Sequence, residues 1–198
     1  MSDFYLTIKG KSEGLCKEKM SKFISFAFPI TTADEAKEII KAHQKEYFDA
    51  RHVCWAYMLG ADRKTFLSND NGEPSGTAGK PILGQINSAN LTNIIIIVIR
   101  YFGGIELGTS GLIAAYKEAA LDAITNAEII ECHEQRVISF AFPYLVMNDV
   151  MKIIKGDEID VLNQEFDNLC KMAITIRADH ADKFRTKILD IEGISILD

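Results

Sequence analysis

The most apolar stretch of the chain is the isoleucine-rich run at residues 93–99. It shows no alternation of apolar and polar positions; Leu-Thr precedes it, and a Gly-Gly pair follows shortly after it. An unalternating run of this length predicts a strand that is buried on both faces. The run continues into Arg100, whose charge a core strand cannot leave without a partner.

The hydrophobic pattern predicts further elements before this strand. Residues 4–8 alternate as a short strand, and residues 11–30 are predicted to form one longer strand, bent near Gly14. Residues 31–35 carry a helix-start pattern, and the helix that follows has an apolar stripe through residues 36–48. Residues 53–59 and 65–68 are two more predicted strands. Strands and helices alternate irregularly, which predicts a two-layer α+β domain and not a doubly wound sheet.

Two glycine-rich loops bracket the isoleucine strand. The second loop, RYFGGIELGTSG, leads into a helical pattern for which Thr109 or Ser110 is the candidate N-cap. The first loop, at residues 70–81, leads into a short helix. Such loops can form an anion site, because glycines let backbone N–H groups approach a ligand and the helix dipole favours negative charge. The alternative is that the glycines serve only chain reversal and close packing, and spacing alone favours it.

We hypothesise that the two loops line one groove that binds an anion or nucleic acid. Arginine suits this role because its guanidinium pairs bidentately with phosphate or carboxylate. The structural alternative is that Arg100 pairs with Glu73 and ties the loops together, which would leave no cationic site. The predicted ligand-binding residues are Arg100, Gly103, Gly104, Gly108, Thr109, Ser110, Ser75, Gly76, Thr77, Gly79 and Lys80, supported by Asp70, Glu73 and His52.

The sequence predicts no catalytic residue, no metal site and no cofactor. Its four cysteines contain no Cys-x-x-Cys pair, a pattern typical of reduced, mostly buried thiols. His52 and Cys54 share a strand face and would suit a nucleophile and base pair or part of a metal site. A half-buried strand histidine is the preferred interpretation, because no third ligand is near in sequence. The glycine loops match neither a P-loop nor a dinucleotide-binding motif.

Charge and hydropathy limit the binding partners and the cellular location that we expect. The 198 residues carry a formal net charge of -6, which counts against a simple phosphate-binding surface. The longest apolar run is far shorter than the roughly 20 residues of a membrane helix. Residues 1–10 do not resemble a signal peptide. We therefore expect a cytoplasmic protein without a membrane partner.

The last third of the chain has a βαββαβ pattern. Strands are predicted at residues 137–142, 159–166, 169–177 and 193–197, and helices at 144–155 and 180–190. This order predicts a ferredoxin-like domain. We divide the chain into domains at 1–134 and 135–198. The second domain lacks evident aromatic stacking pairs of an RNA-recognition motif, which favours an interaction or regulatory module.

Long ordered motifs resemble those of the IMPACT family, and in particular its bacterial YigZ-like members. They are Asp70-x-Gly72-Glu73-Pro74-Ser75-Gly76-Thr77-Ala78-Gly79-Lys80-Pro81, Arg100-Tyr101-Phe102-Gly103-Gly104-x-x-Leu107-Gly108 and Arg51-His52-x-Cys54-x-Ala56-Tyr57. The resemblance implies an amino-terminal domain like the second domain of a small-subunit ribosomal protein. It also implies a carboxy-terminal domain similar to one in elongation factor G. Eukaryotic relatives restrain a translation-initiation kinase through protein contacts, whereas nucleic-acid binding by bacterial relatives is inferred from fold analogy.

The chain departs from the family pattern at three positions. Glu106 and Ala114 stand where basic residues are usual in bacterial members, and Asn71 replaces a usual Asp. If the basic residues contact nucleic acid in relatives, this chain has lost part of that contact. Each lost phosphate contact lowers the affinity for nucleic acid and the salt dependence of binding.

Three functions follow from the sequence. The first is a non-catalytic regulatory protein linked to translation, whose partner is RNA, the ribosome or a protein, bound through the glycine-loop groove and the ferredoxin-like sheet. The second is an enzyme acting on a phosphorylated or nucleotide small molecule at that groove. The third is a protein-interaction module with purely structural glycine loops. The resemblance and the lack of a catalytic constellation favour the first.

Overall fold

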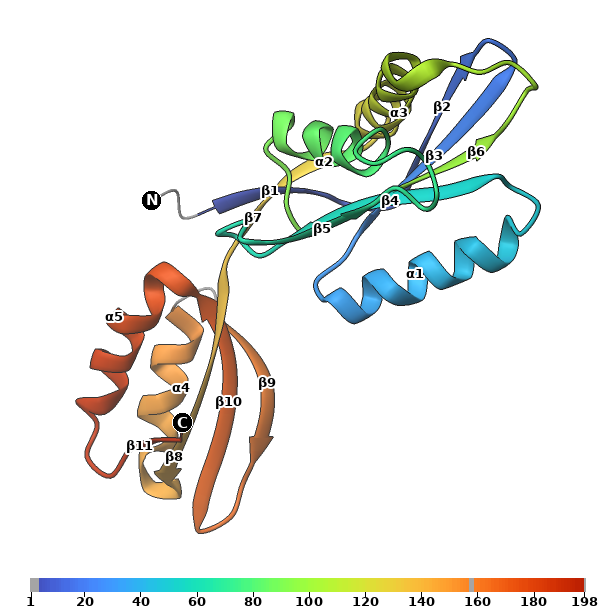
Figure 1. The fold of residues 1–198 in the computed structure, drawn as a ribbon. Helices are drawn as coiled ribbons and strands as arrows, with labels where there is room; N and C mark the ends of the chain where they lie inside the picture. Colours follow the sequence, from blue (N-terminus) through green and yellow to red (C-terminus); the bar gives the residue numbers. More distant parts are fainter. Residues whose placement is uncertain (1–3, 157–158, 198) are drawn as a thin grey trace. The chain divides into compact units, whose positions relative to one another are not determined.

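The computed structural model describes residues 4–156 and 159–197. The chain divides into two compact units, Tyr5–Cys132 and a second one from His133 onward. Each unit combines helices with an antiparallel sheet, so the predicted α+β class is confirmed (Figure 1). None of the described helices is long and apolar enough to cross a membrane.

The first unit is built on a five-stranded antiparallel sheet. Helices α2 and α3 cover one face of this sheet, and α1 lies on the other (Figure 1). A separate two-stranded sheet joins β1 and β7. In sheet order the five strands are β2 (Ser12–Glu18), β3 (Ser21–Pro29), β6 (Ile94–Tyr101), β4 (His52–Leu59) and β5 (Thr65–Asn69); the other elements are β1 (Phe4–Ile8), α1 (Ala33–Glu46), α2 (Gly79–Ser88), α3 (Gly108–Thr125) and β7 (Ile129–His133).

Strand β6 is the centre of this unit. Ile94 to Ile99 are all fully buried, and their side chains alternate between the two hydrophobic cores on either side of the sheet. Each such side chain contributes roughly 1.5–3 kcal/mol by leaving water. The prediction of a strand buried on both faces is confirmed.

Helix α1 begins as its sequence predicts. Thr32 accepts a hydrogen bond from the Glu35 amide, and Glu35 accepts one from the Thr32 amide. This reciprocal capping box satisfies two amides that the first turn would otherwise leave unpaired.

The predicted single strand over residues 11–30 is wrong. The segment is a hairpin of β2 and β3, in register from Ser12 opposite Ala27 to Glu18 opposite Ser21. The two turn residues, Lys19 and Met20, have φ angles of 42° and 68°, as tight hairpin turns require. Neither is the Gly, Asn or Asp that marks such a turn in a sequence, so the apolar pattern gave no sign of the reversal.

The second unit is a ferredoxin-like fold. Its sheet has the order β11-β8-β10-β9, so the first and third strands of the unit lie in the middle. This confirms the βαββαβ prediction. The elements are β8 (Gln135–Pro143), a short 3-10 turn (Tyr144–Val146), α4 (Met147–Gly156), β9 (Ile159–Glu165), β10 (Leu169–Arg177), α5 (Ala178–Leu189) and β11 (Ser195–Leu197).

Gly14 sits where strand β2 packs directly against the last turns of α3. A Cβ atom there would lie 2.5 Å from the Ala123 amide nitrogen and 2.6 Å from Ser25 Oγ. We expect Gly14→Ala to lower the free energy of unfolding by about 1–3 kcal/mol, because the α3 backbone cannot yield.

The matched control is Gly84→Ala in α2, where a Cβ would meet nothing within 4 Å. This change should be neutral or stabilise the protein by up to about 1 kcal/mol, because alanine is the better helix former. Urea denaturation of both variants makes the test. Equal stability of the two variants would contradict the packing argument.

Candidate functional site

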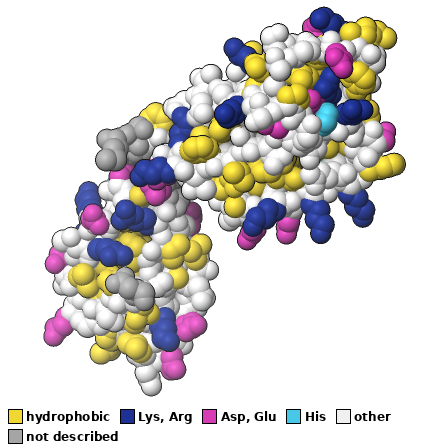
Figure 2. Space-filling model, viewed as in Figure 1, with side chains coloured by type: hydrophobic (Ala, Val, Ile, Leu, Met, Phe, Trp, Pro, Cys, Tyr) yellow, Lys and Arg dark blue, Asp and Glu magenta, His cyan; other side chains and the backbone are white. Residues whose placement is uncertain are grey.

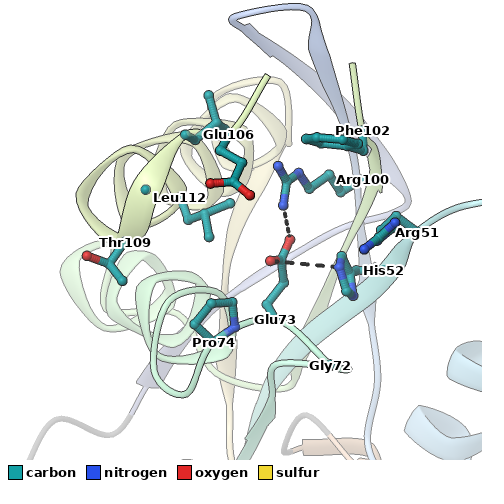
Figure 3. Close-up of a pocket in the computed structure, with 12 residues that line it drawn as sticks. Arg51, His52, Gly72, Glu73, Pro74, Arg100, Phe102, Glu106, Thr109 and Leu112 are labelled. Atoms are coloured by element: carbon teal, nitrogen blue, oxygen red, sulfur yellow. Dashed lines mark hydrogen bonds and ion pairs between the residues drawn. The ribbon is translucent and has the colours of Figure 1, made fainter. Parts of the chain in front are cut away.

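A cavity of about 390 Å³ lies in the first unit, where the ends of several strands meet the start of a helix. The beginning of β4, the turn after β5, the end of β6 and the first turn of α3 enclose it (Figure 3). We call it the α3 pocket. Its lining residues are Arg51, His52, Gly72, Glu73, Pro74, Arg100, Phe102, Glu106, Leu107, Gly108, Thr109 and Leu112.

A buried ion pair forms one wall of the pocket. Arg100 Nη1 donates a hydrogen bond to Glu73 Oε1 at 2.6 Å, and the side chains are only 7% and 3% exposed. The guanidinium carbon also lies over the rings of Phe23 and Phe102, at 5.5 and 5.4 Å from their centroids. Figure 3 shows the guanidinium held between Phe102 and Glu73. The pair ties the first glycine loop to the central strand, which is the structural alternative stated from the sequence.

Glu73 is also the acceptor of a buried hydrogen-bond chain. Tyr116 on α3 donates its hydroxyl to Glu73 Oε1 at 2.9 Å, and Cys54 Sγ lies 3.3 Å from the Tyr116 oxygen. Burial raises the pKa of the Cys54 thiol to about 12, so it is protonated at neutral pH. Because the thiolate is the reactive form of cysteine, Cys54 is not poised as a nucleophile.

His52 lies at the edge of the pocket with its side chain 14% exposed. Its Nδ1 is 2.8 Å from the carbonyl oxygen of Asn71. A carbonyl only accepts, so Nδ1 carries the proton and the neutral ring leaves Nε2 unprotonated. Nε2 is 3.8 Å from Glu73 Oε2, and the two form an ion pair only when the ring is charged.

The first glycine loop is closed by its own aspartate. The Asp70 carboxylate accepts hydrogen bonds from the amides of Gly76, Ala78 and Gly79, at 2.7, 3.0 and 2.8 Å. These amides surround the start of α2, where a bound anion would otherwise sit. Asp70 therefore takes the place of a ligand.

The second loop opens differently. Helix α3 begins at Gly108 with Leu107 as its N-cap and no side-chain cap, so the predicted cap at Thr109 or Ser110 is wrong. Gly108 has a φ angle of 70°, which glycine adopts easily, and the helix starts there, before the predicted cap residues. The first turn of α3 thus faces the pocket without a capping side chain.

The structure brings some predicted site residues together and separates others. Arg100, Glu73, His52, Gly108 and Thr109 line the α3 pocket. Gly103 packs against the β2–β3 turn, where a Cβ would lie 2.1 Å from the Met20 carbonyl oxygen. The predicted residues outside the pocket lining are Gly103, Gly104, Ser110, Ser75, Gly76, Thr77, Gly79, Lys80 and Asp70.

Sequence reasoning missed several lining residues. Arg51 and Phe102 stand beside residues that were selected, and their cation–π contact of 5.8 Å crosses the pocket rim. A signal for Arg51 was present, since it opens the motif that contains His52. In the part of the chain that the structure describes, no three His, Cys, Asp or Glu side chains gather so as to hold a metal ion.

Comparison with known proteins identifies relatives of this chain. The Impact N-terminal domain matches residues 19–124. IMPACT family member YvyE of Bacillus subtilis is 35% identical over 140 residues, which are 71% of this chain and 64% of the relative, so the match spans just under two thirds of that protein. IMPACT family member YigZ of Escherichia coli is 28% identical over 90% of this chain and 88% of its own length. A crystal structure described as a hypothetical protein superposes with a TM-score of 0.78 at 25% identity, covering 100% of this chain and 98% of the other.

Asp70 should give the first loop a pH-dependent stability. Burial alone would raise the pKa of Asp70, but the amides of Gly76, Gly79 and Ala78, with the charge of Lys80, hold it below its ordinary value. Because the pKa is lower in the folded state, the ionised carboxylate stabilises the fold at pH values above the unfolded-state pKa of about 3.9. This stabilisation is lost as the pH falls through the folded-state pKa. We expect Asp70→Asn to cost about 2 kcal/mol at pH 7.

The cost of Asp70→Asn should shrink as the pH falls below about 4, because Asp70 of the unfolded wild-type chain takes up a proton there, and should vanish only at the lower pH where folded Asp70 is also protonated. Urea denaturation of both proteins at pH 7, 5 and 3.5 measures the difference. Asp160→Asn, at an exposed position on β9, is the control substitution. A cost that is the same at all three pH values would contradict the proposed closure of the loop by a carboxylate.

The Arg100–Glu73 pair should be strongly coupled. Glu73→Gln leaves the guanidinium buried without a counter-charge, so we expect a loss of about 3–5 kcal/mol in the free energy of unfolding. The double variant Glu73→Gln with Arg100→Met should be more stable than Glu73→Gln alone, because it also removes the buried charge.

Glu128→Gln serves as the control for that pair, because the Lys9–Glu128 bridge is more than 60% exposed on both sides. Its loss should stay below about 1 kcal/mol. If the Arg100–Glu73 double variant were as unstable as the sum of its two single variants, the coupling would be refuted.

Proposed function

Because the chain belongs to the IMPACT family, we propose that it is a non-catalytic regulatory protein of translation that binds a protein partner. The proposal takes its link to translation from the family resemblance. It takes the class of partner from the α3 pocket, which we propose as the place where an acidic group of that partner is held. A role in translation would place the protein in the cytoplasm.

The observation that carries this proposal is the charge balance of the pocket. Glu73 neutralises Arg100, and Asp70 occupies the amides of the first loop. Arg51 and the first turn of α3 remain as sources of positive potential on opposite sides of the pocket, and Glu106 lies on the α3 side (Figure 3). The remaining positive potential is enough to hold one anionic group. It falls far short of the roughly 6–10 phosphate contacts of a typical nucleic-acid site.

The surface around the first unit supports the same choice. In Figure 2 the positive and negative side chains of the face in view are interspersed, and no wide basic patch is seen on that face. The chain as a whole has a net charge of -6. A ribonucleic-acid backbone would meet repulsion as well as attraction here, whereas a protein partner can match a mixed surface.

The start of α3 supplies the directional part of the proposed contact. Its 18-residue helix carries partial positive charge at Gly108 and Thr109, and no side chain caps it. Leu107, Leu112 and Phe102 provide an apolar surround. A carboxylate flanked by apolar atoms, such as an aspartate or glutamate side chain in a peptide, fits this combination.

One observation favours an enzyme as the second candidate. His52, whose Nε2 is the acceptor atom of the neutral ring, borders a cavity whose volume lies in the range of small-molecule sites. A substrate bound there would find a general base. Against this, Glu73 is occupied by Arg100 and Tyr116, and Cys54 is protonated, so His52 would act without a second catalytic group.

In this proposal the two units have different binding roles. We assign residues 1–134 as the IMPACT-type domain that carries the pocket and residues 135–198 as a ferredoxin-like domain resembling one in elongation factor G. The open sheet of the second domain is then a further contact surface, with the ribosome as a partner that the resemblance suggests.

Site-specific photocrosslinking tests the proposed function. A benzoylphenylalanine at position 109, on the exposed rim of the pocket, should crosslink to proteins of the translation apparatus in an extract of the native cells. Arg51→Glu should reduce these crosslinks at least about tenfold, because it places a like charge against the acidic group. The same crosslinker at position 121, exposed on α3 outside the pocket, is the control for random encounter.

A ligand panel separates the alternatives. RNA that binds in a salt-dependent manner and is released by Arg51→Glu would replace the protein partner with nucleic acid. A nucleotide or phosphorylated metabolite that raises the melting temperature, and loses this effect in His52→Ala, would favour the enzyme. Crosslinks at position 109 that Arg51→Glu leaves unchanged would contradict the proposed role of the pocket.

A further inference from the structure

The five-stranded sheet ends in two outer strands, β2 and β5, and the rest of the described chain closes only one of these edges. At β2, Asp122 of α3 accepts a hydrogen bond from the Leu15 amide at 2.8 Å, and Asn126 donates one to the Glu13 carbonyl at 2.9 Å. Polar side chains thus occupy backbone groups that a further strand would need. The β2 edge is therefore protected from pairing.

Hydrogen bonding in β4 shows which backbone groups of β5 point outward. The Val53 amide donates to the side chain of Asn71, which follows β5, so the backbone of Val53 faces the β5 side. Because this direction alternates along a strand, Leu67 on β5 bonds inward to β4. The amide and carbonyl groups of Phe66 and Ser68 consequently point away from the sheet. In the described part of the chain, no group bonds to them.

The strand at this second edge lacks the usual protection against pairing. We use the name β5 edge for the outer side of Thr65–Asn69, whose sequence TFLSN contains no charge and no proline. Phe66 and Leu67 are 55% and 52% exposed. By contrast, the edge strand β9 of the second unit carries acidic residues and a register shift. An unprotected edge with exposed apolar side chains is a template for another strand.

The sequence of the β5 edge is complementary to itself. When two copies of β5 run antiparallel about a two-fold axis at Leu67, each Phe66 comes opposite Ser68 of the other copy, and each such pair can exchange two hydrogen bonds. The two Leu67 side chains then meet at the axis, where opposed residues are closest. At the ends of the pairing, Lys64 comes opposite Asp70 of the other copy.

The neighbouring registers fit less well. A two-fold axis at Phe66 would set Asp62 opposite Asp70 of the other copy, and like charges directly opposite each other are destabilising. An axis at Ser68 would set the ring of Phe66 opposite the charge of Asp70. The register centred on Leu67 is therefore the one that joins apolar residues to each other and opposes unlike charges.

We propose that the β5 edge is a self-association site, at which a second copy of this chain adds its own β5 antiparallel. The unsatisfied groups at this edge are backbone donors and acceptors, which an extended strand matches. The second copy is the occupant that complements the edge at both its apolar and its charged positions. This inference concerns the margin of the sheet and does not depend on the function proposed for the α3 pocket.

Sedimentation equilibrium of the full chain measures the association. We expect a dimer with a Kd on the order of 10–100 µM, because a short strand pair is a small interface. Leu67→Lys should raise this Kd at least about tenfold, since two like charges would meet at the axis. Leu121→Lys, at an exposed position on α3, is the control and should leave the Kd unchanged. Unchanged melting temperatures would establish that both variants fold.

Disulfide formation tests the register. In Leu67→Cys the two Cα atoms would face each other at about 4.5 Å across the axis, within the range that a disulfide bridges. Oxidised glutathione should therefore link the two copies. The matched control is Phe66→Cys, a neighbouring position of similar exposure whose two copies would be offset along the strands by roughly 7–8 Å. Its yield of linked dimer should be at least about tenfold lower, and the wild-type chain reports the background of the natural cysteines.

Three results would overturn the proposal. They are a chain that stays monomeric at about 1 mM, a Kd that Leu67→Lys leaves unchanged, and equal disulfide yields from Leu67→Cys and Phe66→Cys. The first result would leave the β5 edge to a strand of another protein. The third would place the contact between copies elsewhere on the chain.

Discussion

The buried pair of Arg100 and Glu73 is the constraint on which the first unit depends. A guanidinium at the end of a core strand requires a counter-charge, and the turn after β5 supplies it. The same carboxylate receives the Tyr116 hydroxyl from α3 and faces His52 at the start of β4. One acidic side chain therefore sets the relative positions of a turn, two strands and a helix. The pocket exists because these elements meet around that charge.

The two glycine loops carry out different tasks although their sequences look alike. In the first, Asp70 occupies the amides at the start of α2, so the loop is closed by an internal anion. In the second, α3 starts without a side-chain cap and opens onto the cavity. A glycine-rich motif before a helix is thus compatible with either architecture or binding. The deciding feature is whether the chain provides its own carboxylate within reach of the amides.

The sequence predicted most of the fold because its strongest signals are local. The unalternating run of β6, the capping box at Thr32 and the βαββαβ order each depend on residues close together in the chain. The hairpin at Lys19 and Met20 was missed because side chains there tolerate positive φ without the usual turn residues. The pocket was predicted only in part. It is assembled from four segments between positions 51 and 112, and no local pattern reveals that Arg51 and Phe102 meet.

Strand β4 links the α3 pocket to the hydrophobic core on the opposite face of the sheet. Its first residue, His52, borders the α3 pocket, while Trp55 and Tyr57 point to the opposite face and pack against its hydrophobic core. Hydrogen bonding to β6 on one side and β5 on the other holds β4 rigidly in register. Because alternate residues of a strand point to opposite faces, a single strand can contribute to the pocket and to that core at once. Glu106 lines the pocket beside the start of α3 and opposes an incoming acidic group, so the charge of Arg51 has to outweigh it for the proposed contact to form.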